Sequence, residues 1–315
     1  MKAAVVLGLG QSPAYADFPD PEPAEGAHLI SVTASAITPL ARSRAAGAHY
    51  SSENTFPFVA GMDGVGRLAD GSRVYFLLPK PPDGGFAERT LAPSAQCQPL
   101  PDGLDDVTAA ALANPGMSSS AAFARAGLGT GETVLVNGAT GAAGRLAVQI
   151  AKRLGAQKVI ATGRNLALLE ALGADATIPL VADSEAQETL FRDAFADGVD
   201  VVVDYLWGRS AEGLLAAASK VGARRRLRFV QVGSASGGEI NLPSAVLRSI
   251  PIELMGSGLG SVPYERLMAS LAEVFRMAES GGLSLATRTL PLSDFAAAWA
   301  LDDSATRTVL TMGAQ

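Results

Sequence analysis

The sequence contains few side chains that bind soft metals. Its 315 residues include one cysteine, Cys97, and two histidines, His28 and His49. A single cysteine excludes an internal disulfide and any zinc site built from several cysteines. A zinc-dependent enzyme is therefore disfavoured before any motif is considered, and we predict no metal site.

Long hydrophobic runs and an excess of positive charge are also absent. No apolar run reaches the roughly 18 residues that a membrane-spanning helix needs. Twenty-five Lys+Arg against 31 Asp+Glu give a net charge of −6, and such a balance disfavours nucleic-acid binding because phosphate contacts need clustered cations. The first ten residues lack the full hydrophobic segment and cleavage site of a signal peptide. We therefore expect a cytoplasmic protein that acts on a small molecule.

Two regions of different character follow one another along the chain, whose length suggests about two domains. Residues 1–112 are rich in proline and glycine, with short apolar runs between turn clusters, which favours a β-rich domain. The Ala-rich segment 107–112 is typical of a helix that ends at Asn114-Pro115-Gly116. From Thr133, apolar strands alternate with helical segments, which predicts a parallel sheet covered on both faces. We place this α/β domain at residues 113–262.

The segment from Val134 to Gly144 joins an apolar strand to a helix through a glycine-rich turn. Such a turn brings backbone N–H groups close to a pyrophosphate, and the N-terminus of the following helix favours negative charge. This pattern predicts a dinucleotide site, the alternative being a tight turn without a ligand. The predicted pyrophosphate-binding residues are Gly138, Ala139, Thr140, Gly141, Ala142, Ala143 and Gly144.

The residues after the second strand of this domain indicate the type of cofactor. Sites for NAD carry an acidic residue about 20 residues beyond the glycines, where it binds the ribose 2′-hydroxyl. Here Arg164 stands at that distance, and the first acid is Glu170. A guanidinium suits a 2′-phosphate because it can donate two parallel hydrogen bonds. We therefore predict NADPH, with Gly163, Arg164 and Asn165 at the 2′-phosphate; the alternative is a solvated loop arginine.

Three further segments carry a family resemblance. The stretch 57–66 is similar to P-x-x-x-G-x-[DE]-x-x-G, 84–88 reads Gly-Gly-Phe-Ala-Glu, and 114–119 resembles x-x-G-x-T-A with Ser118 in the threonine's place. With the glycine turn, they make the chain resemble the zinc-free quinone oxidoreductase branch, which includes zeta-crystallin, of the medium-chain dehydrogenase/reductase superfamily. The resemblance implies a GroES-like β-rich substrate domain at 1–112, completed by residues 263–315, a doubly wound Rossmann domain, and a homodimer. It also places four residues on the nicotinamide side: Asn114, Ser118, Gly233 and Ser234.

The sequence departs from the family pattern where the chemistry is expected. Met62 replaces the histidine of the zinc-dependent relatives. In the Asn-x-x-[DE]-x-Tyr stretch of the quinone reductases, Thr38 replaces the asparagine and Ser43 the tyrosine. His49, followed by Tyr50, occupies a later tyrosine position. An imidazole and a phenol can both donate a hydrogen bond, so we take Tyr50, His49, Ser43 and Thr38 as the candidate catalytic residues. The alternative for His49 and Tyr50 is loop packing.

These patterns predict a zinc-independent, NADPH-dependent oxidoreductase that transfers a hydride to a quinone or another electrophilic conjugated carbonyl. A quinone needs the least help from hydrogen-bond donors, because its reduced form is stable, so it suits a site without the usual asparagine and tyrosine. One alternative is an enoyl or enone reductase. Another is an NADPH-binding sensor or structural protein with little turnover.

Overall fold

The computed structural model describes residues 1–52, 55–222, 225–301 and 305–313, and the chain forms two compact units. Unit 1 comprises Met1–Asn114 and Phe275–Gln315, and unit 2 comprises Pro115–Val274. Both boundaries lie inside helices, α2 (Asp106–Ala126) and α8 (Tyr264–Glu279), whereas the sequence analysis placed the second boundary before α8, at 262/263. Apolar residues at helical spacing identify a helix, but they do not show which unit each end of the helix packs against.

Helix α2 corrects one expectation, because it continues through Pro115 instead of ending there. An interior proline removes one backbone hydrogen bond and costs about 3 kcal/mol. Burial offsets this cost: residues 109–113 and 121–123 of the helix are all buried. The hydroxyl groups of Ser118 and Ser119 also donate to the Pro115 carbonyl oxygen, at 2.9 and 2.8 Å. Tertiary packing therefore overrides the local helix-breaking signal.

Unit 2 contains a six-stranded parallel sheet in the order β11-β10-β9-β12-β13-β14. The strands are β9 (Thr133–Asn137), β10 (Lys158–Gly163), β11 (Ala176–Pro179), β12 (Val201–Asp204), β13 (Leu227–Gln231) and β14 (Ile252–Gly256). The chain runs outward from β9 to β11 and then crosses back to β12, so the strand order reverses between β9 and β12. Ligands of open α/β sheets bind beside the carboxyl ends of the strands at such a reversal.

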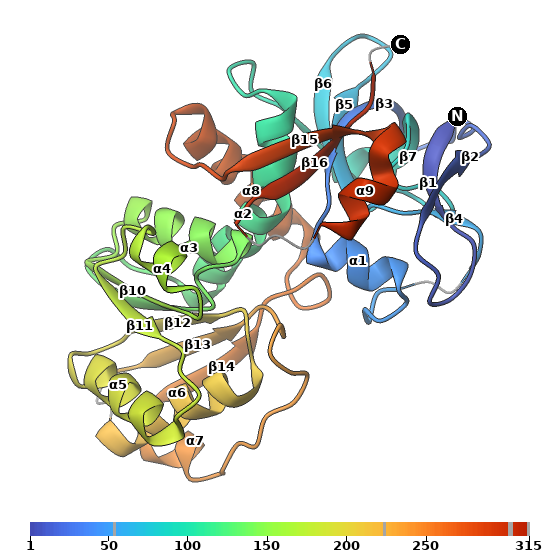
Figure 1. Ribbon diagram of the computed structural model, residues 1–315. Coiled ribbons are helices and arrows are strands. Elements are labelled where there is room, and N and C mark those ends of the chain that lie inside the picture. Colours follow the sequence, from blue (N-terminus) through green and yellow to red (C-terminus); the bar gives the residue numbers. More distant parts are fainter. Residues whose placement is uncertain (53–54, 223–224, 302–304, 314–315) are drawn as a thin grey trace. The chain divides into compact units, whose positions relative to one another are not determined.

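Helices cover both faces of this sheet (Figure 1). On one side lie α3 (Ala142–Arg153) and α4 (Leu166–Glu170), and on the other α5 (Ser184–Ala196), α6 (Gly208–Val221) and α7 (Val246–Ser249). Phe191 of α5 and Leu214 of α6 pack with Phe229 of β13 in a buried apolar cluster. Because both faces are buried, the strands read as continuous apolar runs. The predicted doubly wound parallel sheet is confirmed.

Unit 1 is rich in strands, as predicted. One sheet has the order β15-β16-β3-β5-β6-β8 with β7 also paired to β3, and a smaller one has the order β2-β1-β4. The strands are β1 (Lys2–Val6), β2 (Ala14–Asp17), β3 (Ala27–Ala36), β4 (Phe58–Val59), β5 (Asp63–Arg67), β6 (Arg73–Leu77), β7 (Arg89–Pro93), β8 (Cys97–Pro99), β15 (Thr287–Pro291) and β16 (Arg307–Thr311). The helices are α1 (Pro39–Ala45), α9 (Phe295–Ala300) and the 3₁₀ turns η1 (Ser94–Gln96) and η2 (Leu292–Asp294). Since β16 pairs with β3, the C-terminal segment is part of this unit.

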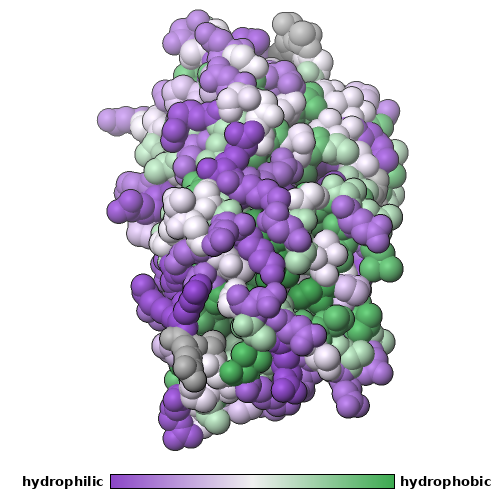
Figure 2. Space-filling view, turned by 90° about the vertical axis from the view of Figure 1, so that its left-hand side faces the viewer, coloured by the Kyte–Doolittle hydropathy of each residue, from purple (hydrophilic) through white to green (hydrophobic). Residues whose placement is uncertain are grey.

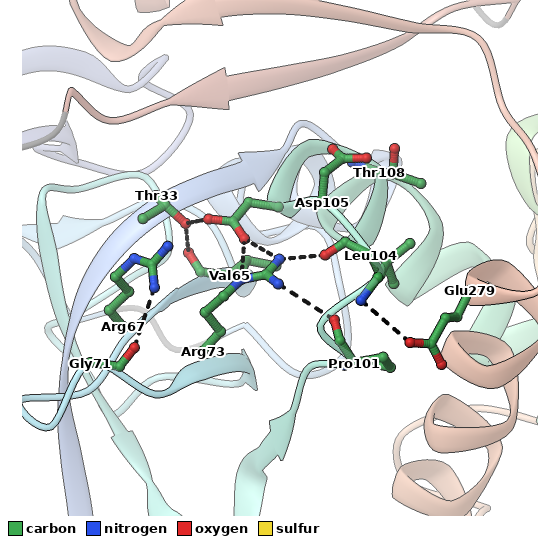
Figure 3. Close-up of polar contacts among 12 residues, drawn as sticks. Thr33, Val65, Arg67, Gly71, Arg73, Pro101, Leu104, Asp105, Thr108 and Glu279 are labelled. Carbon is green, nitrogen blue, oxygen red and sulfur yellow. Dashed lines mark hydrogen bonds and ion pairs between the residues drawn. The ribbon is translucent and has the colours of Figure 1, made fainter.

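A polar cluster fixes the start of α2 within unit 1 (Figure 3). The Nε of Arg73, on β6, donates to the carboxylate of Asp106 at 2.9 Å, and Thr33 Oγ1 on β3 donates to the same carboxylate at 2.6 Å. Arg73 also donates to the carbonyl oxygens of Pro101 and Leu104. A carboxylate in the first turn of a helix is favoured by the helix dipole. The cluster therefore anchors α2 to the sheet of unit 1.

Hydrophilic side chains cover most of the face seen in Figure 2, with smaller hydrophobic areas between them. The large hydrophobic side chains that are exposed are Leu7, Leu9, Tyr15, Leu29, Tyr50, Leu166, Val181, Leu247 and Leu254. In the part of the chain that the structure describes, no helix combines the length and the hydropathy needed to cross a bilayer.

Candidate functional site

The glycine-rich turn between β9 and α3 is shaped by two positions that only glycine can occupy. Gly138 has φ +87°, and a Cβ there would lie 2.8 Å from Leu206 Cγ. A Cβ on Gly144 would lie 2.4 Å from the carbonyl oxygen of Gly138. Gly141 is different, because its φ is −75° and the nearest atom would be 3.8 Å away. Gly138 and Gly144 are thus required for the close approach of turn and helix.

The turn leaves the N-terminus of α3 open to an anion. Gly141 is the N-cap residue and provides no side chain to bond the N–H groups of the first turn. Ala142 and Ala143 in that turn are partly exposed. Unpaired N–H groups and the helix dipole together favour a phosphate at this position. Residues 138–144, all predicted from sequence, therefore form a cradle of the kind a pyrophosphate needs.

A buried hydrogen-bond network holds this turn to the neighbouring strands. Asn137, the last residue of β9, donates from Nδ2 to Asp204 Oδ1 on β12 at 2.8 Å. Its Oδ1 accepts from Thr162 Oγ1 on β10 at 2.7 Å. Thr162 Oγ1 in turn accepts from the N–H of Gly138 at 3.1 Å. Three strand ends and the first glycine are thereby fixed in one arrangement.

Asp204 extends the network into the segment that follows β12. Its carboxylate accepts from the N–H groups of Leu206, at 2.9 Å, and Trp207, at 3.1 Å. Burial raises the pKa of Asp204, and these hydrogen bonds only partly offset that effect. Trp207 has φ 57° and ψ −155°, a backbone conformation that residues with side chains rarely adopt. The Asp204 carboxylate therefore stabilises a strained turn at residues 205–207. Leu206 of that turn packs against Gly138, because it is the residue that a Cβ on Gly138 would meet first.

Ser119 and Tyr205 form a contact that sequence reasoning missed. The two hydroxyl groups lie 2.7 Å apart, and Ser119 Oγ is 3.0 Å from the carbonyl oxygen of Ala143 in the first turn of α3. Burial raises the pKa of Tyr205 well above its usual value, so the phenol stays protonated. Neither residue carries a local signal in the sequence, whereas Asn137, a polar residue ending an apolar strand, could have been noticed.

The four residues predicted on the nicotinamide side are only partly brought together. Gly233 follows β13, and its N–H donates to the carbonyl oxygen of Asp204 at 3.1 Å. Ser234 lies beside it and is partly exposed. Ser118 Oγ is used within α2, where it donates to Pro115. Asn114 is the last residue of the first segment of unit 1. The structure therefore places Gly233 and Ser234 at the ends of the strands, and the other two on α2.

The residues predicted at the 2′-phosphate lie together where β10 ends. Gly163 is buried, and a Cβ on it would be 2.5 Å from Thr140 Cγ2, so this position adjoins the glycine turn. Arg164 is exposed, and Asn165 caps α4 by accepting from the N–H of Leu168 at 3.1 Å. The Arg164 guanidinium is thus carried by a defined turn at the edge of the predicted site.

In unit 1, Thr38 and Ser43 lie at different places on α1. Thr38 is the N-cap residue of α1, and its hydroxyl accepts from the N–H of Ala41 at 2.9 Å. It is only 1% exposed. Ser43 lies further along the helix and is partly exposed. The structure thus gives Thr38 a structural task, the capping of α1, which the sequence analysis did not anticipate.

His49 and Tyr50 lie together in the loop after α1, with ring centroids 4.1 Å apart. Arg44 Nη1 donates to Ser51 Oγ at 3.1 Å, and Ser51 Oγ lies 2.8 Å from His49 Nδ1. The N–H of Ser51 also donates to that nitrogen, at 3.2 Å. Nδ1 therefore accepts, which leaves a neutral ring with its proton on Nε2. Burial and then the charge of Arg44 lower the pKa of His49, which agrees with a neutral ring.

Arg44 also lines a pocket within unit 1, with an empty volume of about 550 Å³. Its apolar walls come from α1, β4 and the segments that follow β4 and β6. Its polar lining includes Arg44, Ser52, Thr55 and Asp83. The hydrogen bonds from Arg44 through Ser51 connect this pocket to His49. The sequence analysis identified neither the pocket nor Asp83.

The tight contacts of Gly144 give a direct test of the turn. Gly144→Ala should lower the free energy of unfolding by about 2 kcal/mol or more, because the new Cβ overlaps backbone atoms. Gly141→Ala is the control and should cost below about 1 kcal/mol, the effect of a weaker N-cap residue. Urea unfolding followed by circular dichroism measures both. Equal losses for the two variants would contradict the packing described.

Comparison with known proteins agrees with this architecture. A family model described as zinc-binding dehydrogenase matches residues 142–275. A "Probable NADPH-dependent quinone reductase" of Emericella nidulans is 30% identical over 342 residues, which cover 93% of this chain and 94% of the relative. The quinone oxidoreductase of Rattus norvegicus is 29% identical, covering 70% and 68%. Among solved structures, the quinone oxidoreductase of Thermus thermophilus, also described in complex with NADPH, has 28% identity and a TM-score of 0.80, covering 99% and 100%. The chain therefore belongs to the medium-chain dehydrogenase/reductase superfamily of enzymes, in its quinone oxidoreductase branch.

Proposed function

We propose that the protein is a zinc-independent, NADPH-dependent oxidoreductase that reduces a quinone or another electrophilic conjugated carbonyl. The observation that carries the proposal is the glycine turn before the uncapped α3, with Arg164 on the adjacent turn. The names of the Emericella and Thermus proteins support NADPH as the cofactor. In this proposal unit 2 binds the cofactor and unit 1 the substrate.

The cofactor supplies a hydride when it is bound, and unit 2 supplies its position. The N–H groups of the first turn of α3 hold the pyrophosphate, and Gly163, Arg164 and Asn165 surround the 2′-phosphate. Gly233 and Ser234 lie at the ends of the strands on the nicotinamide side, and Asn114 and Ser118 complete the predicted set. The buried network around Asp204 keeps these segments fixed, so that little ordering is left to be done on binding.

Zinc does not fit the residues that are present, although the matching family model is described as zinc-binding. Within the described ranges, no three His, Cys, Asp or Glu side chains cluster in a way that could hold a metal ion. Met62 stands at the position of the zinc-binding histidine. Asp63 beside it is buried and accepts from the hydroxyl of Tyr75 at 2.8 Å, and burial raises its pKa to about 6. Burial likewise raises the pKa of the Cys97 thiol to about 11, far from a metal-binding thiolate.

Reduction without a metal requires hydrogen-bond donors for the oxygen on which negative charge develops. Unit 1 offers the Nε2–H of neutral His49, whose tautomer is fixed by Ser51, and the hydroxyl of Tyr50. Tyr50 is 72% exposed. We infer that His49 is a stronger candidate than Tyr50 for the hydrogen-bond donor, because the Tyr50 side chain lies mostly in solvent. Ser43 remains a further candidate, whereas the hydroxyl of Thr38 is used to cap α1.

The proposed reaction can be tested by following NADPH oxidation with an ortho-quinone and with an enone. We expect rapid turnover of the quinone that is unchanged by a metal chelator. Loss of activity with chelator would contradict zinc independence. An enone reduced faster than the quinone would favour the enone reductase. Tight NADPH binding without turnover of either acceptor would favour the sensor or structural protein.

Arg164→Ala should raise the Kd for NADPH by about 10- to 100-fold and leave that for NADH nearly unchanged, because only NADPH carries the 2′-phosphate. Fluorescence titration with the two nucleotides measures this difference. Arg153→Ala, which removes the same charge at the far end of α3, serves as the control. An equal loss for both nucleotides in Arg164→Ala would remove Arg164 from the 2′-phosphate site.

His49→Phe should lower kcat with an enone by about 10-fold or more, since the Nε2–H donor is lost. His49→Gln should restore part of the rate through its amide N–H. Because the neutral ring is the donor and its pKa is lowered, the wild-type rate should not fall between pH 7 and 8. A rate that falls over this range would indicate an imidazolium donor instead. Tyr50→Phe, if equally slow, would shift the role to the phenol.

The homodimer is also part of our proposal, and β14 supports it. This strand is an edge of the six-stranded sheet, and Leu254 on it is 38% exposed. An edge strand with apolar side chains can pair with a second copy. Light scattering should give twice the chain mass of 32.2 kDa. Leu254→Lys should yield monomers and Leu9→Lys should not; a wild-type monomer would contradict the proposal.

A further inference from the structure

The pocket of unit 1 has walls that suit a small, mostly apolar ring. Ala41 and Ala45 line it from α1, Phe58 and Val59 from β4, and Met62 from the segment that follows β4. The space between these walls is partly open to solvent, so a ring can enter it from outside. All of its lining residues belong to unit 1. The apolar walls of the pocket would supply most of the affinity, and the few polar groups in its lining would determine which ring substituents are preferred.

Asp83 is the acidic group of this pocket, and it has no partner among the described residues. No hydrogen bond or ion pair reaches its half-buried carboxyl group from residues 1–52, 55–222, 225–301 or 305–313. Burial is the cause that raises its pKa to about 6, and no neighbouring cation among those residues offsets it. A buried polar group without a partner costs free energy, which a ligand that donates a hydrogen bond would recover.

The backbone around Asp83 is held by hydrogen bonds and close packing, which fixes the point from which its side chain extends. The N–H of Asp83 donates to the carbonyl oxygen of Lys80 at 2.8 Å, and the N–H of Val59 donates to that of Pro82 at 2.8 Å. A Cβ on Gly84 would lie 2.0 Å from the carbonyl oxygen of Val59, so the loop is packed directly against β4. Because the loop is already ordered, a ligand that binds Asp83 has to order only its side chain, which lowers the entropic cost of binding.

Arg44 decides between a neutral and a cationic ligand. Its guanidinium is the cationic group of the same pocket lining, and it is oriented by the hydrogen bond to Ser51. The guanidinium is not among the causes that shift the pKa of Asp83, so it acts on the ligand elsewhere in the lining, where it would repel a cationic ligand but not a neutral one. The combination of an apolar wall, an unpartnered carboxyl group and a guanidinium in one lining therefore favours an uncharged donor.

We propose that this pocket binds the ring of the electron acceptor and that Asp83 selects acceptors carrying a hydroxyl group, which donates to its carboxylate. The proposal rests on the function proposed above for the reaction itself, and adds the substrate class and the residue that determines it. Asp83 acts in recognition, so its removal should change the preference among acceptors and not the binding of NADPH.

Two acceptors of nearly equal size provide the test: hydroxymethyl-1,4-benzoquinone and ethyl-1,4-benzoquinone. We expect wild-type kcat/KM to be about 10- to 100-fold higher for the hydroxymethyl compound, the usual effect of a hydrogen bond to a charged group. Asp83→Ala should abolish this ratio, because the hydroxymethyl compound alone loses a hydrogen-bond acceptor, and Asp83→Asn should retain a smaller ratio. Glu22→Ala, which removes an acid of unit 1 outside the pocket lining, is the charge-matched control. A ratio that persists in Asp83→Ala, or equal losses for both compounds, would overturn the proposal.

A binding measurement that requires no turnover tests the pocket independently of the proposed reaction. Ligand-detected NMR with benzyl alcohol and toluene should show benzyl alcohol binding that is lost in Asp83→Ala, and toluene binding that is not. Binding that depends on Asp83 without quinone turnover would support the pocket and contradict the proposed reaction. Turnover with no dependence of either measurement on Asp83 would contradict the pocket and leave the reaction standing. Asp83→Asn keeps the test valid if Asp83→Ala does not fold.

Discussion

The buried hydrogen bonds among Asn137, Thr162 and Asp204 are the constraint on which the glycine turn of unit 2 depends. They join the carboxyl ends of β9, β10 and β12, and through Thr162 Oγ1 they fix the N–H of Gly138. Buried polar groups of this kind stabilise a single arrangement only when each one is satisfied. The glycine turn, the strained Trp207 and the open end of α3 all adjoin these fixed strand ends, so the geometry of the candidate anion site follows from a few buried side chains.

Three buried or half-buried carboxyl groups have different surroundings, and the difference suggests different roles. Asp204 accepts from two backbone N–H groups and from Asn137, which suits a structural part. Asp63 accepts from the hydroxyl of Tyr75 inside the sheet of unit 1. Asp83 has no partner among the residues that the structure describes, and it lines a pocket. Burial raises the pKa in all three cases, so the number of partners distinguishes them better than the pKa does.

Much of the fold and the glycine turn of the candidate site could be predicted from the sequence. Apolar runs alternating with helical segments identified the parallel sheet, and the spacing of Gly138, Gly141 and Gly144 identified the turn. The end of a helix at Pro115 was wrong, because burial of α2 outweighs one lost hydrogen bond. The second domain boundary, at 262/263, differs from the division at Val274/Phe275, which depends on packing that no local pattern records. Asp83, Ser119 and Tyr205 escaped notice because their significance lies in contacts between distant segments.

The sequence by itself determined the class of fold, the glycine turn and the small number of possible zinc ligands, because each depends on residue type and local spacing. Glycine is required wherever a Cβ would strike backbone, and a chain with one cysteine and two histidines has little with which to bind zinc. Only the tertiary structure decided the tautomer of His49, the capping task of Thr38 and the exposure of Asp83 to a pocket. These depend on hydrogen bonds and burial, which arise only when the chain is folded and its segments are packed together.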